Sequence, residues 1–516
     1  MSGKADKGEN MNAGLSAENS AGKRDCFARS DSAARKLAEQ ESANRDFESR
    51  DFDGHDFVER VLIENGLELP VPVESNSTVK SETVKSETVK SEAAEPEATE
   101  SQTAEQAAQS VTESGSAAGP AAEPDSVSGA SGRAPRLRVH GFTQPWQTRK
   151  LEDFGSSYGG LSGKNKDDFG HGDASFVTYK NVFLNPVADL DNVGSVEIDL
   201  SQNEVRYGDV FFTVSSEIPE EVGMSSVWVG KSENVYLNSF CFGYRPDDES
   251  VDPFFMAYML RSDEVRRKLI FLAQGISRYN ISKKAVLKIE VKLPSMEEQR
   301  LVGRFFSGLD RIIRVQERKT ELLRLSKKYF LQNMFPRRGE SAPRLRVHGF
   351  TQPWQTRKLG EMVSVQSGKD YKSLNEGDVP VYGTGGYMLS VSEALSYSED
   401  AIGIGRKGTI DKPFVLRAPF WTVDTLFYCV PKENYDLDFV NVVFQNVNWR
   451  VLDESTGVPS LSKKIINEVK AKVPSVGEQR QIGMFFSGLD RIIRVQERKT
   501  ELLRQAKKYY LQNMFA

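Results

Sequence analysis

The feature that most constrains the fold of this chain is an internal repeat of two blocks. One block, APRLRVHGFTQPWQTRKL, occupies 134–151 and returns unchanged at 342–359. The other, FFSGLDRIIRVQERKTELLR, occupies 305–324 and returns unchanged at 485–504. The segments between the blocks, about 152–293 and 360–473, show little similarity to each other. This layout predicts two different domains held on one repeated frame.

The second block has the pattern of a long coiled-coil helix. Its apolar residues recur at alternating spacings of four and three, which predicts helices over 297–336 and 477–516. We expect these helices to pair antiparallel, with a pseudo-two-fold axis and the variable domains at opposite ends. An alternative is that each helix only packs on its own domain. The residues expected at the helix or subunit interface are Phe306, Leu309, Ile313, Leu323, Phe330, Phe486, Leu489, Ile493, Leu503 and Tyr510.

Both variable segments have the pattern of α+β domains, with boundaries at 134–296 and 337–476. In the first, we expect strands at 176–179, 195–200 and 209–214 and a helix over 253–273. In the second, we expect strands at 379–382, 401–404 and 425–430 and a helix over 438–452.

Residues 1–133 differ from the rest in composition and charge. They contain 14 basic and 26 acidic residues, whereas 134–516 contain 54 basic and 47 acidic residues. A tandem TVKSE repeat and an Ala/Glu/Ser/Gly/Pro-rich tract predict an acidic extension that is mostly disordered. The near-helical spacing of apolar residues within 52–69 leaves room for a short docking helix. The mild basicity of the remaining chain suits nucleic acid, although many solvated surfaces share it.

Motifs for catalysis are weak in this sequence. Pro246-Asp247 with Glu290-Val291-Lys292 imitates a metal-nuclease signature, but these residues also fit a turn and an exposed strand. The run 383–386, Gly-Thr-Gly-Gly, has no following Rossmann helix and is better interpreted as a β-turn than as a phosphate-binding loop. We therefore expect no catalytic residues and no metal site.

Membrane and disulfide features are also weak. No run approaches the ~18 apolar residues of a membrane span. Cys26, Cys241 and Cys429 lie far apart, and neither they nor the four histidines have metal-ligand spacing. These features predict a reduced, cytoplasmic protein.

Several basic residues stand in a context that suits DNA. The segments 274–284 and 455–464 occupy equivalent places ahead of the long helices, and both combine small polar residues with paired lysines. In 405–408, Gly-Arg-Lys-Gly, glycines permit close backbone approach to a phosphate and the arginine could reach a guanine edge. Solvated basic loops are the alternative for each. The candidate DNA-binding residues are Arg278, Tyr279, Lys283, Lys284, Arg406, Lys407, Lys463 and Lys464.

This layout resembles the specificity subunit of type I restriction–modification systems. The likeness is carried by the G-F-T-x-x-W-x-x-R-K-L blocks at 141–151 and 349–359 and by the L/V-P-S-x-x-E-Q-R junctions at 293–300 and 473–480. Further support comes from the L-D-x-x-I motif that begins at Leu309 and at Leu489 within the predicted helices. Two short segments of the variable domains, GDVFFT from Gly208 and GRKGT from Gly405, also look like family segments. The likeness spans 134–516, about three-quarters of the chain, and does not include the acidic extension.

The resemblance implies two target recognition domains that each read one half of a bipartite DNA site. It also implies that the paired helices dock two modification (methyltransferase) subunits, which restriction (translocase/endonuclease) subunits then join. S-adenosylmethionine, ATP and Mg²⁺ would be bound by those partners and not by this chain. The alternatives from other classes are a scaffold that does not read DNA and a metal-dependent nuclease.

Overall fold

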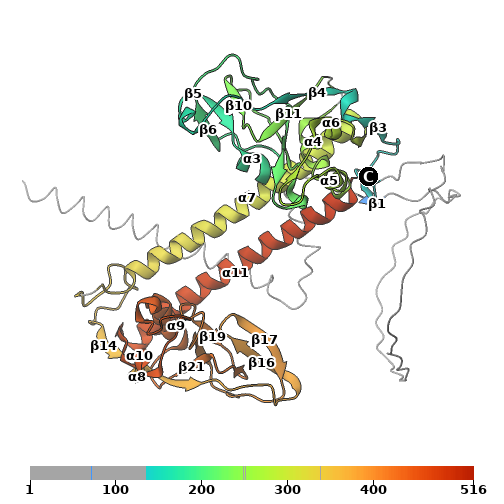
Figure 1. The fold of residues 1–516 in the computed structure, drawn as a ribbon. Coiled ribbons are helices and arrows are strands. Elements are labelled where there is room, and N and C mark those ends of the chain that lie inside the picture. Colours follow the sequence, from blue (N-terminus) through green and yellow to red (C-terminus); the bar gives the residue numbers. More distant parts are fainter. Residues whose placement is uncertain (1–70, 73–134, 248, 250, 338, 516) are drawn as a thin grey trace, which may run out of the picture. The chain divides into compact units, whose positions relative to one another are not determined.

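The computed structural model describes residues 71–72, 135–247, 249, 251–337 and 339–515. These residues form two compact units, one of 305–508 and one that joins the described residues up to 304 with those from 509 onward. Each unit holds one variable segment (Figure 1). Strand β1 (Val71–Pro72) pairs with β2 (Leu137–Arg138). The remainder of the predicted extension, including 52–69, lies outside the described residues.

The first variable segment, called the first domain from here on, is built on a four-stranded sheet of order β4-β11-β7-β9. A three-stranded sheet has the order β10-β5-β6, in which β5 runs parallel to β10 and antiparallel to β6. Two short pairs, β12 with β8 and β13 with β3, complete it. Its elements are β3 (Gln147–Lys150), η1 (Leu151–Asp153), β4 (Gly155–Gly159), η2 (Lys166–Asp168), β5 (Phe169–Val177), α3 (Tyr179–Leu184), β6 (Val193–Val196), β7 (Val210–Thr213), β8 (Ser215–Ser216), η3 (Pro219–Glu221), β9 (Ser225–Val227), β10 (Val235–Leu237), β11 (Cys241–Pro246), α4 (Pro253–Met259), α5 (Asp263–Phe271), β12 (Tyr279–Asn280), α6 (Lys283–Leu287) and β13 (Glu290–Leu293).

The second variable segment, the second domain, repeats this topology. Its four-stranded sheet has the order β15-β21-β18-β19. In its three-stranded sheet, β16 runs antiparallel to β17 and parallel to β20, and β14 pairs with β22. Its elements are β14 (Gln355–Lys358), α8 (Leu359–Met362), β15 (Val363–Ser367), β16 (Glu376–Gly383), β17 (Gly386–Val391), β18 (Ala401–Gly405), β19 (Phe414–Leu416), β20 (Trp421–Thr422), β21 (Leu426–Pro431), α9 (Leu437–Asn446), η4 (Trp449–Leu452), α10 (Lys463–Glu468) and β22 (Lys470–Val473).

The mixed helix and strand content agrees with the α+β expectation, but four predicted elements were wrong in detail. The helix expected over 438–452 ends at Asn446, because Val447 takes an extended conformation before η4. The helix expected over 253–273 is broken into α4 and α5, because Ser262 takes an extended conformation before the start of α5. The strand expected at 176–179 ends at Val177, since Thr178 caps α3 by accepting a hydrogen bond from the amide of Asn181. The strand at 195–200 ends at Val196.

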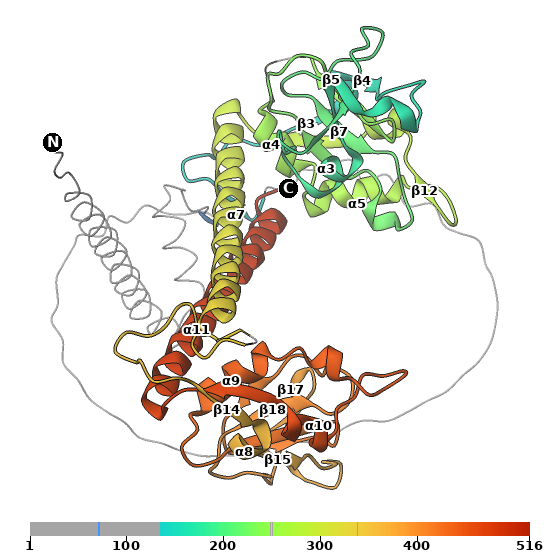
Figure 2. The same cartoon turned by 90° about the vertical axis from the view of Figure 1, so that its left-hand side faces the viewer.

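Two helices of 38 residues each, α7 (Met296–Asn333) and α11 (Val476–Asn513), follow the two domains. They begin one residue earlier and end three residues earlier than the sequence predicts. Within 305–508, α7 and α11 lie side by side in two views (Figures 1 and 2). Their contacts join Gln316 to Gln496, Arg324 to Glu497 and Lys327 to Asp490. Along the ion pairs, the partner on α11 falls from Lys507 (with Asp310) through Arg504 (with Glu317) and Glu497 (with Arg324) to Asp490 (with Lys327). These stretches therefore run antiparallel.

The contacts between the helices come in equivalent pairs. The Lys327–Asp490 contact has its counterpart in Asp310–Lys507, and Arg324–Glu497 has its counterpart in Glu317–Arg504. Each counterpart follows from the offset of 180 residues between the two sequence copies, which is also the separation of Gln316 and Gln496.

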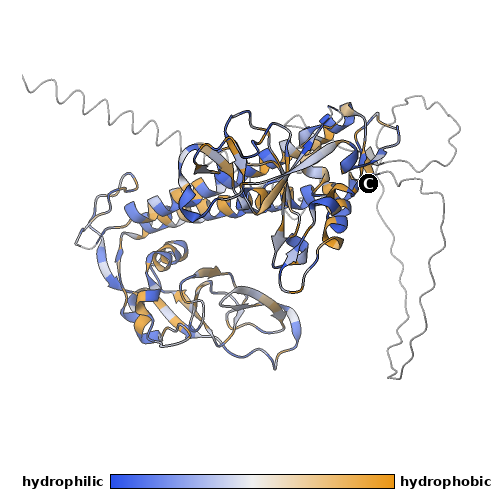
Figure 3. Ribbon diagram, turned by 45° about the horizontal axis from the view of Figure 1, so that its top comes forward, coloured by the Kyte–Doolittle hydropathy of each residue, from blue (hydrophilic) through white to orange (hydrophobic). Residues whose placement is uncertain are grey.

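Figure 3 shows how hydrophilic and hydrophobic residues alternate along the long helices. Of the residues expected at the helix or subunit interface, two are half-buried, Leu323 and Phe330. Eight are buried: Phe306, Leu309, Ile313, Phe486, Leu489, Ile493, Leu503 and Tyr510. Their assignment to a subunit interface stays a prediction. No helix within the described part of the chain is long and apolar enough to cross a membrane.

Candidate nucleic-acid interface

In the second domain, two of the basic segments singled out in the sequence lie against each other. Residues 406–408 directly follow strand β18, whose residues are all buried. The amide of Gly408 donates to the carbonyl of Pro459 (2.8 Å), and the amide of Leu461 donates to the carbonyl of Arg406 (2.9 Å). Backbone pairing therefore holds Arg406 and Lys407 next to the segment that leads to Lys463 and Lys464.

A buried aromatic ring positions two of these cations. The Arg406 guanidinium and the Lys463 ammonium each lie 6.0 Å from the centre of the Phe427 ring. Phe427 lies in β21 and is buried, so the ring is a fixed platform. Lys463 begins α10, whose N-cap Ser462 accepts a hydrogen bond from the amide of Ile465. Cation–π attraction at this distance favours a defined position for both charges.

The β16–β17 hairpin contributes a third segment to the same end of the second domain. Its turn is the Gly383-Thr384-Gly385-Gly386 run, with Gly383 and Gly386 as the closing pair, so the expected β-turn is confirmed. A methyl group placed on Gly408 would lie 3.8 Å from Thr384 Oγ1, which places the turn beside the Arg406 segment. Tyr387 follows the turn with 63% of its surface exposed.

In the first domain, the edge equivalent to 406–408 of the second domain is formed by a pair of short strands. Strand β8 pairs with β12, with Tyr279 opposite Ser216 and Asn280 opposite Ser215. The amide of Ile281 donates to the carbonyl of Val214 (3.0 Å), the counterpart of the Leu461–Arg406 bond. The candidate residues Arg278, Lys283 and Lys284 are exposed around this pair, and Tyr279 is half-buried.

A pocket of about 530 Å³ opens beside Arg278 in the first domain. Its walls include Tyr179, Phe183, Ile218 and Phe240, and Phe240 is 63% exposed. The Tyr179 hydroxyl donates to the carbonyl of Ser215 (2.9 Å), which links the pocket to β8. At this edge the first domain thus combines a pocket of mixed polar and apolar lining with exposed cations, whereas the second domain places its cations near a buried ring.

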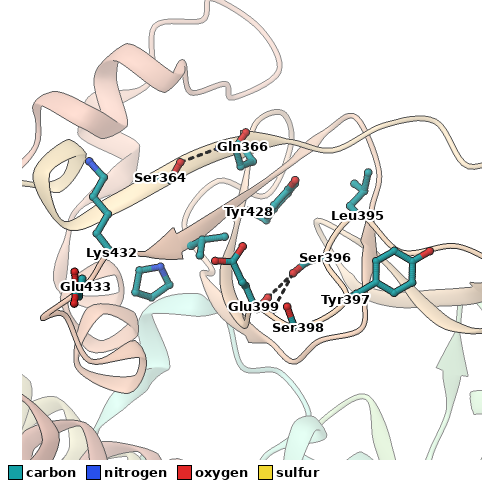
Figure 4. A pocket seen from close by; sticks show the side chains of 12 residues that line it. Ser364, Gln366, Leu395, Ser396, Tyr397, Ser398, Glu399, Tyr428, Lys432 and Glu433 are labelled. Atoms are coloured by element: carbon teal, nitrogen blue, oxygen red, sulfur yellow. Dashed lines mark hydrogen bonds between the residues drawn. The ribbon is translucent and has the colours of Figure 1, made fainter.

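A second pocket, of about 680 Å³, lies in the second domain. Figure 4 shows its lining, in which the Gln366 amide donates to Ser364 and the Ser396 hydroxyl donates to the carbonyl of Glu399. Tyr428 and Lys432 also line it. None of the candidate DNA-binding residues takes part in this pocket.

A buried ion-pair network in the first domain was missed by the sequence analysis. Asp209 accepts hydrogen bonds from Arg245 at 2.7 and 2.8 Å and from the Tyr158 hydroxyl at 2.6 Å. Burial, with the Asp209 carboxylate beside it, raises the pKa of Tyr158 well above its ordinary value. The neutral phenol therefore remains a hydrogen-bond donor, and the network supports the centre of the four-stranded sheet.

The structure places the nuclease-like residues apart from any metal-binding cluster. The amide of Asp247 donates to the carbonyl of Phe154 (2.9 Å), and Glu290 begins strand β13. Across the described stretches of the chain there is no group of three or more His, Cys, Asp or Glu side chains that could hold a metal ion. Cys241 and Cys429 are buried free thiols, and burial raises the pKa of Cys241 to about 12.

Two arginines of the repeated entry blocks bind glutamates of the junctions that precede the long helices. Arg138 forms a buried bidentate pair with Glu298 at 2.7 and 2.8 Å, and Arg346 forms the equivalent pair with Glu478 at 2.8 Å. Both acids belong to the Glu-Gln-Arg junctions. The repeated blocks thus bind each other, and sequence reasoning missed this contact although both blocks occur twice.

Comparison with known proteins gives one consistent answer. The family model described as the type I restriction modification DNA specificity domain matches residues 143–324 and 351–505. A Methanocaldococcus jannaschii protein named as the specificity subunit of the type I restriction enzyme MjaX is 22% identical over 408 residues, 72% of this chain and 93% of that protein. The MjaVIII specificity subunit of the same organism is 20% identical over 317 residues, 53% of this chain and 71% of that protein.

A solved structure shares the fold. The type I restriction–modification S subunit from M. genitalium aligns with a TM-score of 0.55 and 18% identity, covering 74% of this chain and 99% of that chain.

Proposed function

The chain belongs to the type I restriction–modification DNA specificity family, and from that premise we propose that it reads a bipartite DNA site. Each half of the site is read by one domain. The observation that supports this division best is that the two domains have the same topology but carry different side chains at the equivalent edge, 406–408 in one and 214–216 in the other.

We assign phosphate contacts and base contacts to different members of the candidate set. Lys283, Lys284, Lys407 and Lys464 are flexible point charges that suit phosphates, which carry no sequence information. Arg406 has a planar guanidinium that can bind guanine O6 and N7 together. Its position above Phe427 favours a fixed approach to a base edge.

The helix pair acts in this proposal as an antiparallel coiled coil that separates the two readers. A helix of 38 residues extends ~57 Å at ~1.5 Å per residue. The Gln316–Gln496 contact lies at the centre of the equivalent ion pairs and fixes the register, and it marks the pseudo-two-fold axis of the helices.

The reactions belong to partner subunits in this proposal. Two modification subunits dock on the chain and supply S-adenosylmethionine-dependent methylation, and restriction subunits supply ATP- and Mg²⁺-dependent cleavage. This chain is their non-catalytic reader and is cytoplasmic. The family membership supports this division of work.

The test is an exchange of 360–473 for the corresponding segment of another family member. Genome-wide adenine methylation is then mapped in cells that carry the chain with its partner subunits. We expect one half of a bipartite motif to change while the other half persists. The matched control exchanges 152–293, which is expected to change the opposite half. Methylation that keeps both halves after either exchange would favour a scaffold that does not read DNA.

A further inference from the structure

The two domains are seated on the long helices through the same set of contacts, although their sequences differ. Each seat consists of a glutamine and a glycine on the long helix and an aspartate and a phenylalanine on the domain. The first seat is Gln299 and Gly303 with Asp252 and Phe255, and the second is Gln479 and Gly483 with Asp436 and Phe439.

In both seats the glutamine side chain binds backbone atoms of the domain and of the junction. Gln299 Oε1 accepts from the amide of Asp252 (3.0 Å) while its Nε2 donates to the carbonyl of Pro294 (3.0 Å). Gln479 makes the equivalent bonds to Asp436 (3.2 Å) and Pro474 (3.1 Å), and both glutamines are buried. Because backbone atoms are common to all sequences, this contact can hold domains of different sequence.

The aspartate of each seat is the N-cap of a short domain helix. Asp252 accepts from the amide of Phe255 and Asp436 from the amide of Phe439, both at 2.9 Å. The cap fixes the first turn of α4 and of α9, and the phenylalanine at its third position is fully buried. The shared sequence requirement on the domain is therefore Asp-x-x-Phe.

The C-terminal end of a long helix covers each phenylalanine. Phe515 follows α11 and lies 5.6 Å from Phe255, and Phe335 follows α7 and lies 6.0 Å from Phe439, measured between ring centres. Both aromatic residues come from the repeated Met-Phe ending of the helix blocks. Each domain is thus held by the start of one long helix and the end of the other.

The glycine lets the capped helix approach the long helix closely. A methyl group on Gly303 would lie 2.7 Å from the amide nitrogen of Phe255 and 2.8 Å from Asp252 Oδ1. A methyl group on Gly483 would lie 2.5 Å from Asp436 Oδ1 and 2.8 Å from the amide nitrogen of Phe439. Ordinary contact needs ~3.5 Å or more, so any side chain here must displace the domain by up to ~1 Å.

We propose that these two seats set the spacing between the half-sites by fixing the angle of each recognition domain on the helices. This inference rests on the proposed function. One base pair advances a DNA strand by ~3.4 Å. The DNA-reading edge of each domain lies away from its seat, so a tilt that moves the seat by ~1 Å moves that edge farther. The movement of the edge then approaches the ~3.4 Å rise of one base pair. The seats are positioning elements and read no bases themselves.

The test uses the full chain with its partner subunits and maps methylated sites by half-site sequence and by spacer length. Gly483→Ala is expected to keep both half-site sequences while methylation at the native spacer falls ~10-fold and sites one base pair longer or shorter become methylated. Gly477→Ala is the matched control, because a methyl group there meets only the Phe350 ring at 3.5 Å, an ordinary contact. The control is expected to retain the native spacer.

A second pair of variants keeps the test decisive if Gly483→Ala does not accumulate. Asp436→Ala removes the cap and is expected to broaden the spacer preference, whereas Asp436→Asn keeps a side-chain acceptor at the N-cap and is expected to restore it. Methylation that falls in the Ala variants at an unchanged spacer would overturn the inference and leave the seats with a structural role alone. A wild-type chain that yields no bipartite motif would instead overturn the proposed function.

Discussion

The two domains share one strand topology, but they differ in the residues that follow the equivalent central strand. After β18 the second domain continues with Arg406 and Lys407, whereas after β7 the first continues with Val214 and Ser215. The backbone bond to the next segment is the same in both, Leu461 to Arg406 and Ile281 to Val214. Backbone pairing thus fixes where the edge lies and leaves its side chains free to differ.

The residue before the same strand shows a second difference. Asp209 has 1% of its side chain exposed and is bound by Arg245, whereas Asp400 has 34% exposed and binds Arg417, which is 63% exposed. One position of the topology therefore holds a buried ion pair in the first domain and a surface ion pair in the second. The energetic consequences should differ, because loss of Asp209 takes the acceptor from the Tyr158 hydroxyl and from Arg245, which is 29% exposed, whereas Arg417 is 63% exposed and remains solvated without Asp400.

The largest expected effect follows from this difference. Asp209→Ala is expected to destabilise the first domain by about 3 kcal/mol, since Arg245 and the Tyr158 hydroxyl both lose their acceptor. Asp400→Ala is expected to cost the second domain about 1 kcal/mol or less. Hydrogen exchange of the amides in β7 and β18 measures each domain separately. An equal rise in amide exchange in both variants would show that the buried and the surface ion pair stabilise their domains equally.

The next effect concerns DNA. Replacing both Arg406 and Lys463 by alanine is expected to weaken binding at the second half-site by about 1–3 kcal/mol, roughly 5- to 150-fold, and to relax its base preference. The preference at the first half-site should persist. Binding of the assembled complex to duplexes with one altered half-site measures this. Lys432→Ala is the control, because Lys432 lies in the pocket that contains none of the candidate residues.

An equal loss of preference at both half-sites would show that the cations near Phe427 contribute only general attraction. The corresponding change in the first domain, Arg278→Ala, is expected to affect the other half-site. Its effect should be smaller, because Arg278 is an exposed residue at the rim of a pocket and no buried ring fixes its position as Phe427 does for Arg406.

The frame could be predicted from sequence because its signals are local and repeated. Heptad spacing located α7 and α11 within three residues at either end. The same repetition located the Glu-Gln-Arg junctions, but it did not reveal that their glutamates pair with arginines of the entry blocks. Arg138 and Glu298 are 160 residues apart, and no local pattern reports that they meet.

The common topology of the domains could not be predicted, because it rests on pairing between distant strands. Strand β5, for example, pairs with β10 through residues 175–177 and 235–237, and neither run carries a sequence signal for its partner. The convergence of 406–408, 459–464 and the β16–β17 turn is likewise a product of tertiary structure. Sequence identified these basic segments singly, and their assembly into one surface had to come from the fold.

A smaller effect distinguishes phosphate contacts from base contacts. Lys283→Ala with Lys284→Ala is expected to weaken binding about equally at all sites. The slope of log affinity against log salt should fall by about 2, since each phosphate contact contributes ~0.9. A salt titration of the assembled complex measures the slope. A changed half-site preference without a change in slope would assign these lysines to bases.

The smallest expected effect concerns the contacts that stabilise the edge after β7 in the first domain and after β18 in the second. The first domain uses the backbone pair β8–β12, whereas the second adds an exposed ion pair, Arg450 to Asp411 at 2.5 Å. The hydrogen bond from Arg450 holds the pKa of Asp411 below its ordinary value. A carboxylate whose pKa is lowered on folding contributes stability above its unfolded pKa, and that contribution is lost as the pH falls through the folded value.

Arg450→Ala is therefore expected to speed hydrogen exchange at the Leu461 amide only slightly at pH 7, because an exposed pair is screened by solvent. Below the lowered pKa of Asp411, variant and wild type should exchange alike. The Ile281 amide of the first domain is the internal reference and should not respond to the substitution at either pH. A variant effect that persists undiminished in acid would mean that Arg450 stabilises the edge by packing, and the two domains would then close their edges without any difference in charge.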